Sequence, residues 1–183
     1  MEPVASIDYE PHPPAPGRLE LVQRFANTID EEHGREVLHS PEALRTLLVR
    51  LGLLDPGAHV GARELAAAHD VRDRIRALAL ANNGIATDVE LEAELVVRID
   101  DANAVLAPAQ RDVPGALAEL AGIVYTARAD GTWSRLKACR ADTCRWLFYD
   151  RSRNRSAVWC SMAVCGNRTK TRAYRARRPA TRS

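Results

Sequence analysis

The stretch CRADTCRWLFYDRSRNRSAVWCSMAVCGNR, residues 139–168, contains all four cysteines of this 183-residue chain. They form two pairs of C-x4-C spacing, with fifteen residues between the pairs. A tetrahedral zinc site needs four ligands around one ion, and two close pairs of thiols allow two turns of the chain to supply them. Gly166, directly after the last cysteine, suits a tight turn whose N–H groups point at a thiolate sulfur. The spacing predicts one structural zinc ion bound by Cys139, Cys144, Cys160 and Cys165.

Two other uses of the four cysteines stay open at this point. Disulfide bonds would need an oxidising compartment, which the N-terminal sequence does not indicate. A catalytic zinc ion would keep one coordination position open beside a base, whereas four thiolates close the coordination shell. Structural zinc is therefore the favoured interpretation.

The residues between the two cysteine pairs are expected to form a small core around the metal. The apolar side chains are Trp146, Leu147, Phe148, Val158 and Trp159, on a short hairpin that turns at 150–156. So short a segment cannot fold without a metal or another surface to pack on. After the last cysteine, Asn167 is expected to cap a helix that ends before Pro179.

The charge of the chain is divided unevenly along its length. Residues 1–134 carry 12 Lys or Arg against 22 Asp or Glu, a net charge of −10, whereas residues 135–183 carry 14 against 2, a net charge of +12. Such an asymmetry indicates a module that meets a polyanion, most often nucleic acid, attached to a body that does not. A basic segment that only increases solubility is the alternative.

The cations near the C-terminus are candidates for contact with nucleic acid. Arg168, Arg172 and Arg175 share one face of the expected helix. Cations in the first turn oppose the helix dipole unless an anion such as phosphate approaches them. A solvated helix or a disordered tail is the alternative. The full candidate set is Arg168, Lys170, Arg172, Arg175, Arg177 and Arg178 of the helix, with Arg151, Arg153 and Arg155 of the connector.

The acidic part of the chain has mainly helical periodicity. Helices are expected over 19–29, 41–51, 62–81 and 113–128, with Ser40 as an N-cap and Gly52 and Gly84 as stops. Thr87 and Glu90 have the spacing of a capping box, which predicts a short helix after them. The apolar runs 95–99 and 104–106 flank an Asp-Asp-Ala-Asn break and predict a small β-hairpin.

These patterns divide the chain into four expected segments. Residues 1–17 hold five of the ten prolines and are expected to be a flexible arm, and residues 179–183 a disordered tail. Residues 18–134 form the helical part and residues 135–178 the zinc finger. No apolar run is long enough to span a membrane and the N-terminus is unlike a secretory signal, so a cytoplasmic location is expected.

The segment from Cys139 to Arg178 resembles the CGNR zinc finger, a family named for the four residues that begin here at Cys165. The segments FANTID (25–30), SPEALRTLL (40–48) and GLLD (52–55) are similar to the ABATE domain, which usually precedes this finger in bacterial stress-induced transcription regulators. The resemblance implies zinc at the four cysteines and DNA contact from the basic finger. We expect a mainly α fold with a small β-hairpin, followed by a treble-clef-like or ribbon-like zinc finger that ends in a basic helix.

Two functions remain as hypotheses. The first is a DNA-binding transcription regulator whose helical body senses a small-molecule effector or forms a homodimer. Asn27, Asp30 and His33, at the end of the first helix, are candidates to line an effector pocket, and a solvated turn is the alternative. The second is an interaction protein whose basic finger docks on its own acidic body or on a protein partner, without direct DNA binding. An enzyme is not expected, because the chain lacks an H-E-x-x-H motif, a Gly-rich phosphate loop and a nucleophile elbow.

Overall fold

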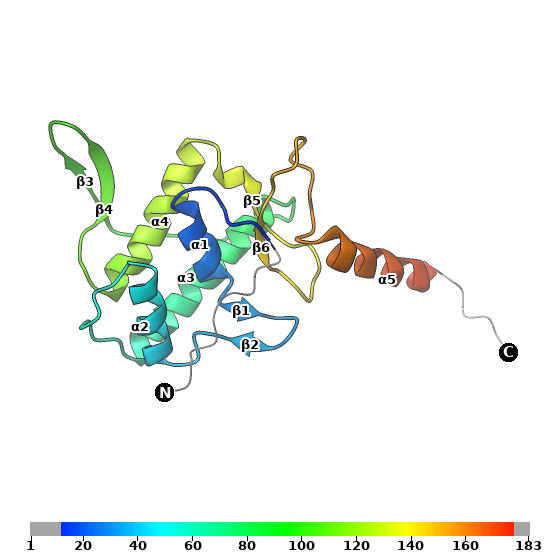
Figure 1. The fold of residues 1–183 in the computed structure, drawn as a ribbon, viewed down its shortest axis with the longest axis horizontal. Helices are drawn as coiled ribbons and strands as arrows, with labels where there is room; N and C mark the ends of the chain where they lie inside the picture. Colours follow the sequence, from blue (N-terminus) through cyan, green and yellow to red (C-terminus); the bar gives the residue numbers. More distant parts are fainter. Residues whose placement is uncertain (1–11, 178–183) are drawn as a thin grey trace.

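The structure is a computed structural model that describes residues 12–177. Residues 1–11 of the expected arm, Arg178 and the expected tail 179–183 lie outside the described residues. The described part contains five α-helices and three two-stranded antiparallel sheets (Figure 1). The helices are α1 (Leu19–Ala26), α2 (Pro41–Arg50), α3 (Ala62–Ala81), α4 (Val113–Ala129) and α5 (Asn167–Arg177). The strands are β1 (Ile29–Asp30), β2 (Arg35–Glu36), β3 (Leu95–Ile99), β4 (Ala104–Pro108), β5 (Leu136–Ala138) and β6 (Leu147–Tyr149).

The helix ends of the body follow from local chemistry. The hydroxyl of Ser40 accepts a hydrogen bond from the Ala43 N–H at 3.1 Å, so the predicted N-cap of α2 is confirmed. Asp112 caps α4 in the same way, through the N–H of Gly115. Gly52 and Gly84 follow α2 and α3 with positive φ, a conformation that favours glycine.

Two local expectations were wrong. Ile29 lies in β1 instead of continuing α1, since the helix ends at Ala26 and Asn27 turns the chain. Residues 85–94 form no helix, and the hydroxyl of Thr87 instead accepts a hydrogen bond from the Val89 N–H two residues on.

The predicted hairpin at 95–106 is confirmed as β3 and β4, which project from one end of the body (Figure 1). The Leu95 side chain contacts α4: its two Cδ atoms lie 3.5 Å from the position that a Cβ at Gly122 would occupy. Towards the turn, Val97 is 64% exposed and Ile99 75% exposed. The base of the hairpin is therefore packed on α4 while its apolar tip faces solvent.

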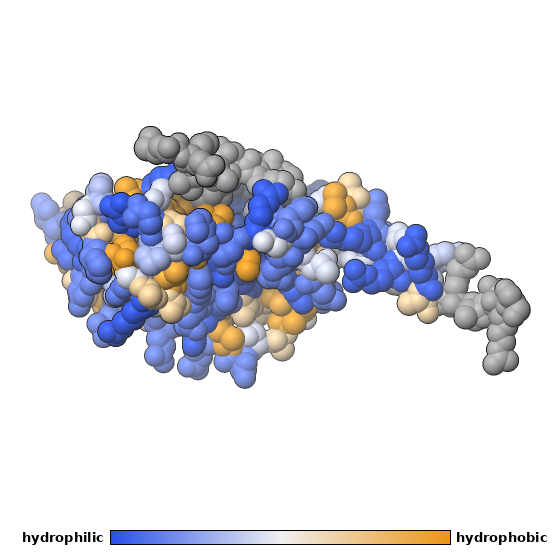
Figure 2. Space-filling model, turned by 90° about the horizontal axis from the view of Figure 1, so that it is seen from below, coloured by the Kyte–Doolittle hydropathy of each residue, from blue (hydrophilic) through white to orange (hydrophobic). Residues whose placement is uncertain are grey.

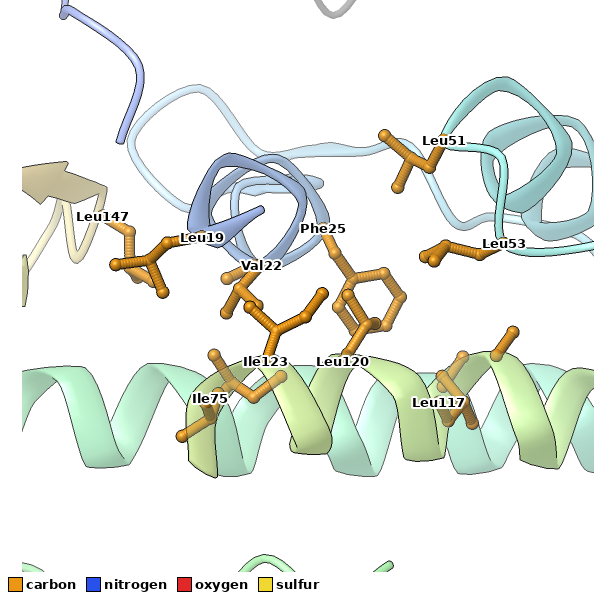
Figure 3. Packing of buried hydrophobic residues seen from close by; sticks show 14 of the residues in the cluster. Leu19, Val22, Phe25, Leu51, Leu53, Ile75, Leu117, Leu120, Ile123 and Leu147 are labelled. Carbon is orange, nitrogen blue, oxygen red and sulfur yellow. The ribbon is translucent and has the colours of Figure 1, made fainter. Parts of the chain in front are cut away.

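One hydrophobic core lies among α1, α3 and α4, with α2 against it (Figure 3). Figure 3 shows Phe25 of α1 at Leu120 of α4 and Val22 beside Ile123, and all four side chains are buried. The same core includes Leu136 of β5 and Leu147 of β6, both fully buried, and Figure 3 shows Leu147 beside Leu19. The core therefore continues across residue 134, where the charge of the sequence changes sign.

The last residues of the expected arm are packed. Ala15 is buried, and its N–H donates to the Gln23 side chain at 2.6 Å. The carbonyl of Pro14 accepts a hydrogen bond from Arg151 of the connector. The described chain therefore begins to pack at residue 14, four residues before the boundary expected from the sequence. No helix of residues 12–177 is both long and apolar enough to cross a membrane.

Candidate metal centre

The four cysteine sulfurs converge on one point. All four Sγ atoms lie within 4.8 Å of one another, and the thiols are free, so the disulfide alternative is not supported in this structure. The Sγ atom of Cys160 lies 3.6 Å from that of Cys144 and 3.7 Å from that of Cys165. A zinc–sulfur distance of about 2.3 Å in a tetrahedron gives sulfur–sulfur edges of about 3.8 Å. The donor set and its dimensions fit one zinc ion with a closed shell.

The four cysteine thiols of the cluster differ in the direction in which their pKa values are shifted. Hydrogen bonds from Cys144 and Cys160 lower the pKa of Cys139 to about 2. Its thiolate in turn raises the pKa of Cys144 to about 12 and also raises that of Cys160, while burial raises the pKa of Cys165. Zinc binding would release protons from this cluster, since thiolates are the ligands of the ion.

The elements around the cluster explain why the sulfurs meet. Cys139 directly follows β5 and Cys144 lies three residues before β6, so this hairpin carries the first pair. Trp146 and Trp159 pack against the sulfurs and cover them with apolar surface. Cys160 precedes a π-helical turn, Met162–Gly166, that runs directly into α5.

The helix that follows the cluster begins earlier than expected. Ser161 is the N-cap, since its hydroxyl accepts from the Val164 N–H at 3.2 Å, whereas Asn167 is already helical. The expected role of Asn167 as a cap was therefore wrong. A Cβ at Gly166 would lie 2.5 Å from the Met162 sulfur and 3.4 Å from the Trp159 ring, so a larger residue there would displace the flexible Met162 side chain.

The connector between the cysteine pairs is organised by a buried ion pair. Lys137 Nζ lies 2.7 Å from the Asp150 carboxylate and also donates to the carbonyls of Arg155 and Ala157. Burial alone would raise the pKa of Asp150, but hydrogen bonds from Lys137 and Ser152 outweigh it and hold the pKa below its ordinary value. The expected hairpin turning at 150–156 was wrong: these residues form a loop wrapped around the Lys137 ammonium, and the strand pair is β5 with β6.

The body holds the finger through side-chain amides. Asn27 donates to the carbonyl of Leu147 at 2.9 Å and accepts from its N–H at 2.8 Å, as an added strand would. Asn83, after α3, donates to the carbonyls of Ala138 and Val158 at 2.8 Å each. These contacts, with the shared core, correct the expectation of a separate small core: Leu147 packs with the body helices, and only the tryptophans remain at the cysteines.

Arg168 joins the metal centre to the body. Its guanidinium forms two hydrogen bonds with the carboxylate of Glu32, between β1 and β2, and lies 3.5 Å from the Cys165 sulfur. The pair lowers the pKa of Glu32 and raises that of Arg168. Four thiolates around a divalent ion leave a net negative charge, so this cation also compensates the cluster.

The other predicted contact residues are mostly on the surface. Lys170, Arg172 and Arg175 are exposed along α5, which ends at Arg177 and extends away from the body (Figure 1). Arg153 and Arg155 are exposed on the connector, while Arg151 bonds Pro14 and lies over the Tyr149 ring at 5.7 Å. Arg178 lies outside the described residues. Arg168 and Arg172 line one hollow, which Arg175 does not reach.

The three candidate effector residues have local partners. Asn27 is buried and uses its amide to bind Leu147. Asp30 accepts from the backbone and the ring of His33, the latter at 2.7 Å, within the exposed turn between β1 and β2. The structure thus brings Asp30 and His33 together at the surface and turns Asn27 inward.

Sequence reasoning missed two groups. Arg140 lines the hollow beside α5 together with Arg168 and Arg172. Its position directly after the first cysteine was a usable signal, since convergence of the cysteines brings it near the residues that follow the last one. The pairing of Lys137 with Asp150 had no local signal, because their separation of 13 residues reflects no helical or strand period.

Two family comparisons match the chain. The ABATE family, described as “Putative stress-induced transcription regulator”, matches residues 19–145, and the CGNR zinc finger family matches residues 135–178. The two matches overlap over the β5 strand and the first cysteine pair, the same residues that the body core and the metal centre share. Neither description is that of an enzyme. A comparison with curated proteins gave no match.

Proposed function

Because the chain belongs to the ABATE family and carries a CGNR zinc finger, we propose that it is a DNA-binding transcription regulator. The basic finger contacts DNA, and the helical body senses an effector or pairs two copies of the chain. The observation that carries this proposal is α5, a cationic helix that projects from the body beside the zinc cluster (Figure 1).

The composition and exposure of α5 support contact with a polyanion. Its sequence NRTKTRAYRAR has five cations and no acidic residue. Figure 2 shows this projection as mostly hydrophilic. A helix that is polar on all sides has no core to pack on and mutually repelling charges along its length. Phosphate groups of a duplex would neutralise those charges and release counterions, which favours binding.

The zinc ion has a positioning role in this proposal. When bound by Cys139, Cys144, Cys160 and Cys165, it would fix the π-helical turn that leads into α5 against the β5–β6 hairpin. The hairpin is itself part of the body core. The orientation of α5 relative to the body therefore depends on the metal centre.

A salt-dependent binding titration tests the proposal. Fluorescence anisotropy of a labelled mixed-sequence duplex is followed with the full-length zinc-loaded protein at several salt concentrations. We expect the logarithm of the binding constant to fall linearly with log salt, with a slope of about −5 or steeper, because several phosphates are neutralised. Absence of binding at low salt would refute the proposal.

Autoinhibition by the acidic body is the second candidate, favoured by the contact of Arg168 with Glu32. It predicts that Glu32→Gln, in the full-length protein, tightens DNA binding severalfold, with Glu42→Gln as a control on an exposed ion pair elsewhere. Deleting residues 1–134 would not test it, since Leu136 and Leu147 would lose their core partners. Equal affinity of Glu32→Gln and wild type would reject the autoinhibited form.

The proposed role of the body in effector binding or dimerisation is supported by its exposed apolar surface. A groove of about 660 Å³ lies between β4 and α4, bordered by Leu106, Ile123 and Tyr125. The apolar tip of the β3–β4 hairpin extends beyond it. Light scattering of wild type and Ile99→Asp tests the dimer: a homodimer through this surface predicts that only the variant is monomeric.

A further inference from the structure

A hollow of about 300 Å³ lies between the first cysteine loop and α5. Arg140, Asp142 and Thr143 border it on the loop side, and Arg168, Thr169 and Arg172 on the helix side. The two walls are at least 25 residues apart in sequence, counted from Thr143 to Arg168, and they meet because Cys139 and Cys165 belong to one cluster. The hollow is therefore a product of the metal centre.

The charges around the hollow are unequally neutralised. Arg168 is already bound to Glu32, and the carboxylate of Asp142 lies 3.2 Å from the Arg145 guanidinium. Among residues 12–177, by contrast, no side-chain hydrogen bond or ion pair engages the guanidinium of Arg140 or of Arg172. Two exposed cations from different segments thus face one concave surface with the neighbouring acid already paired.

The surroundings of Arg140 limit where its guanidinium can lie. A Cβ atom at Gly84, three residues after the end of α3, would be 3.2 Å from Arg140 Nη2, so the turn after α3 lies next to the guanidinium. Gly84 has φ +79°, a conformation that favours glycine, and it has no side chain that would displace the Arg140 guanidinium. The Arg140 guanidinium therefore lies next to the backbone of the turn that follows α3.

We infer that Arg140 and Arg172 together bind one phosphate of the DNA backbone in this hollow. Guanidinium groups provide paired N–H donors that match phosphate oxygens, and two of them from opposite sides can bind one phosphate at the same time. The Thr143 hydroxyl, on the loop wall, adds a donor, whereas the Thr169 hydroxyl already donates to the Cys165 carbonyl. This inference rests on the proposed function and gives it one defined contact.

The contact positions the protein on DNA and does not read sequence. Phosphate contacts fix register and orientation, while base edges carry the sequence information. Since the two walls are joined through the cysteine cluster, the phosphate would lie next to the metal centre. The exposed cations Lys170 and Arg175 of α5 are left for other phosphates or for bases.

The test compares four variants of the full-length zinc-loaded protein in the anisotropy titration. They are Arg140→Gln, Arg172→Gln, the double variant of these two, and the control Lys170→Gln, which lies about 160° around the helix from Arg172. The control substitution is also combined with Arg172→Gln. Arg140 and Arg172 are both exposed, so folding should be retained, and zinc content and circular dichroism check it. Loss of one phosphate contact reduces the salt slope by about 1, which is about tenfold in Kd at 0.1 M salt relative to 1 M.

The double variant distinguishes one shared phosphate from two separate ones. We expect each single variant, and also the double variant, to lose about 1 unit of slope, whereas combining Lys170→Gln with Arg172→Gln should add the losses of the two single variants. A loss of about 2 units in the double variant would mean separate phosphates and would overturn the inference. Wild-type affinity of the Arg140→Gln variant for the duplex would also overturn the inference, but it would leave the proposed DNA binding intact. If wild type binds no duplex, the proposed function fails and the phosphate site fails with it.

Discussion

Removing the side-chain amide of Asn27 should loosen the finger from the body. In Asn27→Ala, the N–H of Leu147 loses its partner at 2.8 Å and its carbonyl keeps only Gln23, at 3.3 Å. Leu147 is fully buried, so solvent cannot replace the lost hydrogen bonds. The unsatisfied N–H costs about 1–3 kcal/mol and the hydrogen bond lost at the carbonyl about 1 kcal/mol more, so the total is about 2–4 kcal/mol. For a chain of this size, that lowers Tm by about 4–16 °C.

Thermal unfolding of the zinc-loaded protein, followed by circular dichroism, measures this cost, with Asn154→Ala on the exposed connector as the control. Because Leu147 belongs to the body core and its strand follows Cys144, zinc release to a chelator should also be faster in Asn27→Ala than in the control. A Tm within 2 °C of the control, or unfolding in which body and zinc site melt independently, would refute this account of the interface.

Three further predictions concern the connector, the cluster and a helix cap. Lys137→Met should cost about 3–5 kcal/mol at pH 7, because it leaves the Asp150 carboxylate buried and unpaired. The pKa of Asp150 is lowered in the folded protein, so its stabilisation is present above about pH 4 and is lost as the pH falls. The deficit of Lys137→Met in urea unfolding should therefore narrow at pH 3.5, and an equal deficit at both pH values would contradict the pairing. Zinc analysis after dialysis against a chelator should give about one ion per chain for wild type and far less for Cys160→Ser, and full retention by the variant would exclude Cys160 as a ligand. Ser40→Ala should cost about 1 kcal/mol in the same unfolding assay through loss of the α2 cap, and no change would show that the cap is dispensable.

The sequence was sufficient where local chemistry decides structure. The cap at Ser40, the stop at Gly84 and the β3–β4 hairpin each depend on residues within a few positions of one another. The four cysteines were also recognisable, because thiols at short repeated spacing have few other uses in one chain. These features needed no knowledge of how distant segments meet.

What the sequence did not reveal depends on contacts across the fold. Leu147 was assigned to a core of the finger, since its neighbours in sequence are a tryptophan and a cysteine, but its backbone partner is Asn27, 120 residues away and directly after α1. Arg168 was a candidate for DNA contact because it begins a basic run, and only the fold shows that Glu32 lies opposite it. Charge counting identified the right segment and could not tell which of its cations were already paired.

The single core beneath the helices and the β5–β6 hairpin constrains how such proteins can be recombined. A finger moved to another protein by cutting at residue 134 would expose Leu136 and Leu147. It would also lose the hydrogen bonds from the amides of Asn27 and Asn83. A finger exchanged between relatives can fold only if its hairpin matches the body surface that covers Leu136 and Leu147. Duplication or shuffling of the finger alone would therefore be selected against, and the two parts should be inherited together as one unit.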